Sequence, residues 1–144
     1  IDLLLQKARV LKRQIKFKWY VIGDGPDRAE LEHLREKLNL KDEVDFLGYM
    51  KNPYPIMKKC DALVLVSKYE GTPVTIDEAM VLGIGIIAPA IGGIPEQIER
   101  YKKSSLLDVS EIKKIILNWD LAENEQFDYR SSNLERVRKL RQVL

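Results

Sequence analysis

Glu70 and Glu78 are the two residues whose types and spacing could do chemistry together. Glu70 follows an apolar run, and Glu78 falls in the second turn of a helix that is expected to begin at Pro73. Each carboxylate can accept hydrogen bonds from two hydroxyl groups, which suits the vicinal diol of a sugar or a ribose. Free N–H groups at the start of the helix would face a diphosphate. The alternative is that Glu70 is a loop charge and Glu78 a solvated helix residue.

Four loops follow predicted strands, at residues 23–26, 48–51, 67–73 and 89–95. In an open parallel sheet such loops meet at the carboxyl ends of the strands, where ligands bind. All four carry glycine, and three of them end on the proline that marks the start of the next helix. Helix N-termini favour phosphate, and glycine lets the backbone approach a ligand closely. Together the loops predict an anion site, although in any single loop glycine and proline could simply form a turn.

Helices and strands are predicted to alternate along the whole chain. Apolar residues at helical spacing predict helices over residues 1–11, 26–38, 52–59, 73–83, 109–122 and 133–144, and one more that opens at residues 92–95. Apolar and β-branched runs predict strands over residues 17–22, 44–47, 62–66, 84–88 and 106–107. This alternation is typical of an α/β fold, an open parallel sheet with helices on both faces and right-handed crossovers.

Two details refine the predicted sheet. Residues 62–66 are continuously apolar, which is typical of a parallel strand buried on both faces. The chain opens on a helix, whereas an α/β unit normally opens on a strand, so we expect the sheet to lack its first strand. The chain also lacks an initiating Met, which fits a processed chain or an excised fragment.

Composition narrows the class of protein. The chain has 144 residues, one domain's worth, and its 45% hydrophobic residues exclude intrinsic disorder. The balance of 24 basic and 22 acidic residues gives no argument for nucleic-acid binding. One cysteine excludes a disulfide framework and a cysteine-built zinc site, and one histidine excludes a multi-histidine metal site. The sequence shows neither a membrane-length apolar run nor a signal-peptide pattern.

Several ordered blocks resemble the retaining glycosyltransferases of family 4. The Glu70 and Glu78 pair matches their Glu-x7-Glu signature, within residues 67–83. Further matching blocks occur in the family's order at residues 21–26, 44–48, 60–62 and 92–96. The resemblance runs from the start of the chain to about residue 100 and is weaker beyond. A set of ordered blocks is far more specific than one motif.

The resemblance implies a GT-B enzyme, in which two Rossmann-like domains face each other across a cleft. This chain is similar to the C-terminal domain, which binds the nucleotide sugar. Residues 1–130 would form that donor domain, and the helix of residues 131–144 would pack back toward the absent N-terminal acceptor domain. The implied reaction transfers a sugar from a UDP- or GDP-sugar to a glycan or lipid-linked acceptor, with retention and without a required metal ion. The implied location is the cytoplasm, at the inner face of the membrane where the acceptor is lipid-linked.

The resemblance also implies roles for individual residues. Glu70 would bind the donor-sugar hydroxyls and Glu78 the ribose. The remaining implied contacts are to the sugar and diphosphate (Gly71, Thr72, Val74, Thr75) and to the base (Gly48, Tyr49, Met50). Gly23 and Gly25 would let the chain pass close to the nucleotide, and Gly92 and Gly93 are further implied substrate-binding residues.

The chain departs from the family pattern at its start. The Arg and Lys that contact the diphosphate in the family would precede Ile1, so we expect this chain to bind nucleotide weakly and not to turn over alone. The alternatives are a GT-B sugar-nucleotide epimerase and a non-catalytic nucleotide-binding α/β module. The basic residues between Lys7 and Lys18 form either a solvated face or a contact with an anionic membrane. The apolar stripe of the last helix could support self-association.

Overall fold

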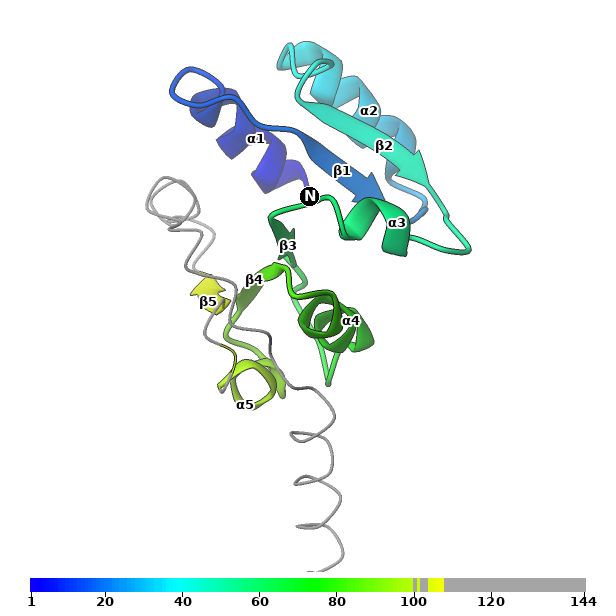
Figure 1. Ribbon diagram of the computed structural model, residues 1–144. Helices are drawn as coiled ribbons and strands as arrows, with labels where there is room; N and C mark the ends of the chain where they lie inside the picture. Colours follow the sequence, from blue (N-terminus) through cyan, green and yellow to red (C-terminus); the bar gives the residue numbers. More distant parts are fainter. Residues whose placement is uncertain (100, 102–103, 108–144) are drawn as a thin grey trace, which may run out of the picture.

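A computed structural model describes residues 1–99, 101 and 104–107 (Figure 1). Its elements run in the order α1 (Asp2–Leu11), β1 (Trp19–Ile22), α2 (Arg28–Lys37), β2 (Val44–Gly48), α3 (Tyr54–Met57), β3 (Ala62–Val64), α4 (Val74–Leu82), β4 (Gly85–Pro89), α5 (Ile94–Ile98) and β5 (Ser104–Leu107). The predicted alternation of helices and strands is thereby confirmed over the described residues. The helices predicted over residues 109–122 and 133–144 lie outside the described residues.

All described strand pairs are parallel, as predicted. β1 pairs with β2, from Trp19 opposite Val44 to Ile22 opposite Gly48, with one shift of register after Val21. β4 pairs with β3 on one side and with β5 on the other. The strands therefore form two sheets, β1–β2 and β3–β4–β5, rather than one continuous sheet.

The burial of β3 corrects one prediction. Residues 62–66 were expected to be buried on both faces, but all five are only half-buried. The reason is position, because β3 ends its sheet and has a strand neighbour on one side only among the described residues. The strand buried throughout is β4, which lies between β3 and β5.

A first apolar core holds α1 and α2 on one face of the β1–β2 sheet (Figure 1). Side chains alternate across a strand, so Trp19 and Val21 of β1 share a face. Leu5 and Ala8 of α1 are fully buried in the same cluster. Tyr20 points to the opposite face and is 43% exposed. The α1–β1–α2–β2 half thus has a core of its own.

A second core joins α4 and α5 to the other sheet. Ile76 and Met80 of α4 pack with Ile86 of β4 and Ile94 of α5. Gly83 ends α4 in the left-handed conformation at φ 72°, as its position predicted. Two cores, one for each sheet, therefore position the loops that follow the strands.

No helix in the described part of the chain is long and apolar enough to cross a bilayer.

Candidate functional site

The loop between β3 and α4 holds Glu70. Its carboxylate oxygen Oε1 accepts a hydrogen bond from the Ser67 hydroxyl at 2.6 Å. Glu70 is half-buried, whereas the preceding Tyr69 is 91% exposed. One carboxylate oxygen is thus fixed within the loop, and Glu70 still has capacity to accept hydrogen bonds from a ligand.

Glu78 lies one turn into α4 and is half-buried. Its Oε1 accepts a hydrogen bond from the Tyr54 hydroxyl at 2.8 Å. This hydrogen bond and the negative charge of Glu78 raise the pKa of Tyr54. Tyr54 opens α3, so the contact joins the segment after β2 to α4. Both predicted acids are therefore held by a hydroxyl donor that the sequence did not assign to the site.

Backbone donors between the two acids are available to a ligand. α4 begins at Val74, after Pro73 in an extended conformation. Within the described residues, the amides of Thr72, Val74 and Thr75 have no acceptor, as expected at the start of a helix. Such donors, with the positive end of the helix dipole, suit an anionic group.

The glycines just before α5 pack against the loop between β3 and α4, which carries Glu70. Gly92 has φ +53°, and a Cβ there would collide with the carbonyl oxygen of Glu70. The Gly93 amide donates to the Gly71 carbonyl at 2.9 Å. Gly92 was predicted to bind substrate, and in the structure its backbone approaches the loop that carries Glu70.

Gln97 of α5 fixes the same loop to α4. Its side-chain amide Nε2 donates to the Pro73 carbonyl at 3.1 Å and to Asp77 Oδ1 at 2.9 Å. Gln97 is only 5% exposed. A buried amide with two such bonds rigidifies the start of α4. Sequence reasoning missed Gln97, although a glutamine among the apolar positions of a short helix is a usable signal.

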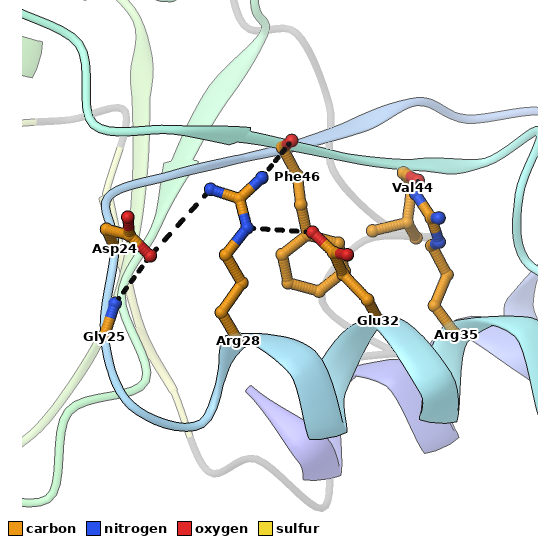
Figure 2. Close-up of polar contacts among 7 residues, drawn as sticks. All are labelled: Asp24, Gly25, Arg28, Glu32, Arg35, Val44 and Phe46. Carbon is orange, nitrogen blue, oxygen red and sulfur yellow. Dashed lines mark hydrogen bonds and ion pairs between the residues drawn. The ribbon is translucent and has the colours of Figure 1, made fainter.

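The loops after β1 and β2 form a second cluster (Figure 2). The Gly23 amide donates to the Gly48 carbonyl at 2.8 Å. The Gly25 amide donates to Asp24 Oδ1 at 2.9 Å. The structure thus brings three predicted site glycines together, but two of their amides are already engaged within the protein.

Arg28 holds this second cluster in place. Its Nε lies 2.8 Å from Glu32 Oε1, and its Nη1 lies 3.8 Å from Asp24 Oδ1 (Figure 2). Its Nη2 donates to the Phe46 carbonyl at 3.3 Å. Gly48 has φ +73°, and a Cβ there would lie 2.6 Å from Arg28 Nη1. The i, i+4 spacing of Asp24, Arg28 and Glu32 was a signal for these ion pairs.

The two residues that follow Gly48 border this cluster. Tyr49 is 79% exposed and Met50 is half-buried. The described residues contain no group of three histidine, cysteine or acidic side chains placed to hold a metal ion.

The basic residues between Lys7 and Lys18 are partly neutralised. Lys12 Nζ lies 3.1 Å from Glu43 Oε1, and Lys18 Nζ lies 2.9 Å from Asp45 Oδ2. Two of the cations that suggested a membrane contact are therefore paired with acidic side chains within the α1–β2 half.

Comparison with known proteins gives the family. The family model described as "Glycosyl transferases group 1" matches residues 1–139, and the chain belongs to this family. Of the three classes that the sequence left open, the match supports the glycosyltransferase.

Two curated relatives illustrate the match, a synthase and a glycosyltransferase by name. The chain is 31% identical over 108 residues to N-acetyl-alpha-D-glucosaminyl L-malate synthase of Bacillus anthracis, covering 75% of this chain and 28% of that protein. It is 27% identical over 138 residues to the putative colanic acid biosynthesis glycosyltransferase WcaL of Salmonella typhimurium, covering 90% of this chain and 34% of that protein. The chain thus spans about a third or less of the length of these relatives.

Solved structures support the fold. Anabaena Alr3699/HepE in complex with UDP is similar with a TM-score of 0.71 at 22% identity, over 97% of this chain and 44% of that one. A mutant of TarM from S. aureus, in a complex that includes UDP, is similar with a TM-score of 0.75 at 25% identity, over 93% of this chain and 29% of that one. The fold is that of GT-B glycosyltransferases, with parallel strands in open sheets.

Proposed function

We propose that this chain is the donor-binding domain of a retaining glycosyltransferase that takes its sugar from a UDP- or GDP-sugar. The observation that carries the proposal is the arrangement around the start of α4. Two half-buried carboxylates, Glu70 and Glu78, each held by a hydroxyl, flank backbone amides that are open to a ligand. Carboxylates for diols and amides for a diphosphate are the groups that a nucleotide sugar requires.

In the proposed site each group has one role. Glu78 accepts hydrogen bonds from the ribose, and Glu70 accepts them from the donor sugar. The amides of Thr72, Val74 and Thr75 bind the sugar and diphosphate. As the bond to the sugar breaks, negative charge builds on the leaving diphosphate, and preorganised N–H donors stabilise that charge. The glycines of the second cluster, Gly23 and Gly48 among them, shape the wall near the nucleotide.

In this proposal, the acceptor is bound by a part of the polypeptide outside this domain. The relatives are about three times as long, which supports an acceptor domain in the same polypeptide and a glycan or lipid-linked acceptor bound there. The 144-residue chain by itself is therefore expected to bind nucleotide weakly and to transfer no sugar. Sugar transfer by this chain alone would contradict that part of the proposal.

Isothermal titration with UDP, GDP and ADP tests the proposal. We expect at least one of the three to bind, and a matched titration in EDTA to give the same affinity, because metal independence is part of the proposal. Glu30→Gln, which changes an exposed acid in the first turn of α2, serves as the control and should bind as the parent does. Failure of all three nucleotides to bind a folded sample at millimolar concentration would contradict the proposal.

A further inference from the structure

Tyr54 is placed to take part in the same site, although no motif singled it out. Its hydroxyl donates to Glu78 Oε1 at 2.8 Å across a separation of 24 residues. The Tyr54 side chain is 45% exposed, and Glu78 is half-buried. The contact therefore lies at a surface that a ligand can reach, and not in the core.

The backbone around Tyr54 is fixed before any ligand binds. The Tyr54 amide donates to Asn52 Oδ1 at 3.2 Å. The Pro53 carbonyl accepts from the amides of Ile56 and Met57, each at 3.0 Å. Met57, the last residue of α3, is 8% exposed and packs in the second core. α3 is thus anchored at both ends, and the ring of Tyr54 extends from a rigid turn.

The hydrogen bond leaves a defined set of acceptors for a diol. The Tyr54 proton is committed to Glu78 Oε1, so the lone pairs of its hydroxyl oxygen remain as acceptors. Glu78 Oε2 is the second acceptor, and its orientation is set because Oε1 is held. A tyrosine hydroxyl keeps its proton at neutral pH, and the hydrogen bond to Glu78, together with its charge, raises the pKa of Tyr54 further. Two fixed acceptors beside each other match two neighbouring hydroxyl donors.

We infer that Tyr54 positions the Glu78 carboxylate and offers its own hydroxyl oxygen to the same ribose diol, so that it selects ribose over 2′-deoxyribose. This inference rests on the proposed function, in which Glu78 binds the ribose. Tyr54 is accordingly a positioning and specificity residue and takes no part in bond breaking. A bare surface contact would leave ribose recognition unchanged when the hydroxyl is removed.

The experiment compares four proteins, namely the parent 144-residue chain, Tyr54→Phe, Glu78→Gln and the control Tyr20→Phe. Tyr20 has a similar exposure of 43% and lies on β1, whereas Glu78 lies on α4. Each is titrated with UDP and with 2′-deoxy-UDP, or with GDP and 2′-deoxy-GDP if GDP binds the parent more tightly. A thermal melt of each variant checks that it folds as the parent does.

We expect the parent to prefer the ribonucleotide. Tyr54→Phe should weaken UDP binding about three- to tenfold, the effect of one hydrogen bond, and should bring the UDP to 2′-deoxy-UDP ratio down toward one. Tyr20→Phe should change neither quantity. The ratio is the decisive readout, because a purely structural role would lower both affinities together.

Different failures have different meanings. If Glu78→Gln leaves UDP affinity unchanged, the ribose assignment in the proposed function is wrong. If Glu78→Gln weakens UDP but Tyr54→Phe keeps the parent's ratio of the two affinities, the proposed function stands and the inference about Tyr54 is overturned. Equal weakening of both nucleotides by Tyr54→Phe also overturns it.

Discussion

The α1–β2 half and the β3–β5 half use glycine-bearing loops in different ways. In the first half, the Gly23 and Gly25 amides are taken by the Gly48 carbonyl and by Asp24. In the second half, amides at the start of α4 remain open, and the glycines before α5 press against the loop that carries Glu70. Loops that share glycine and proline thus differ in whether their backbone donors are free. In the proposed function, the open donors of the second half bind the ligand, and the first half forms part of the surrounding wall.

The two halves also differ in what surrounds their glycines of positive φ. Gly48 and Gly92 both have positive φ. A Cβ at Gly48 would meet the end of the Arg28 side chain, which can move aside. A Cβ at Gly92 would meet the backbone of Glu70, which cannot move without moving the site. An alanine at Gly92 should therefore destabilise the protein more than an alanine at Gly48.

The largest effect on stability is expected for Gly92→Ala. The new Cβ collides with the Glu70 carbonyl, and the left-handed backbone is strained for alanine. We expect a loss of about 3 kcal/mol in the free energy of unfolding, from overpacking and strain together. Thermal and urea unfolding measure it. The control is Gly25→Ala, where a Cβ meets nothing within 4 Å. Equal stabilities of the two variants would show that the Gly92 contact does not hold the loop.

A smaller effect is expected for Tyr101→Phe in the second core. Tyr101 is 4% exposed, and its hydroxyl donates to the Ile84 carbonyl at 2.7 Å. Losing this bond leaves a buried carbonyl without that donor, at a cost of about 1–2 kcal/mol. Urea unfolding at pH 7 measures the cost, with Tyr20→Phe as the exposed control. A loss no larger than that of the control would refute the prediction.

The same residue predicts a dependence on alkaline pH. Burial raises the pKa of Tyr101 above its ordinary value of 10.0. A group whose pKa is raised on folding contributes stability below its unfolded pKa, and this contribution is lost as the pH rises through the folded value. The parent should therefore lose stability above about pH 10 more steeply than Tyr101→Phe. Parallel melting curves from pH 9 to 11 would contradict this.

The smallest effect is expected in the first half, for Lys12→Met. Lys12 pairs with Glu43 at 3.1 Å, and its ammonium also donates to the Asn39 carbonyl. Removing a partly exposed pair should cost about 1 kcal/mol or less. Amide hydrogen exchange should rise in β1 and β2 and stay unchanged in β4. Lys16→Met, at an exposed neighbouring lysine, is the control. Faster exchange in β4 would show that the halves are coupled.

Local signals predicted much of this fold. Pro73 and Gly83 correctly marked the start and the end of α4. Apolar and β-branched runs predicted every described strand. The burial of β3 could not be predicted this way, because an apolar run does not reveal how many neighbours its strand has.

The site was predicted only in its local parts. Glu70 and Glu78 stand in one segment, so their types and spacing were visible. The contact between Tyr54 and Glu78 spans 24 residues and depends on how α3 packs, which no local pattern encodes. The same holds for Gln97 and Asp77, which are 20 residues apart.

The division of labour between Glu70 and Glu78 is tested most directly by titrating Glu70→Gln and Glu78→Gln with UDP and with UDP-glucose. If the titrations described above favour GDP, then GDP and a GDP-sugar replace them. Glu78→Gln should weaken both ligands by about 1–3 kcal/mol, because both contain the ribose. Glu70→Gln should weaken only the nucleotide sugar, and Glu30→Gln neither. Weakening of UDP by Glu70→Gln to the same extent as UDP-glucose, or unchanged binding of UDP to Glu78→Gln, would contradict the assignment.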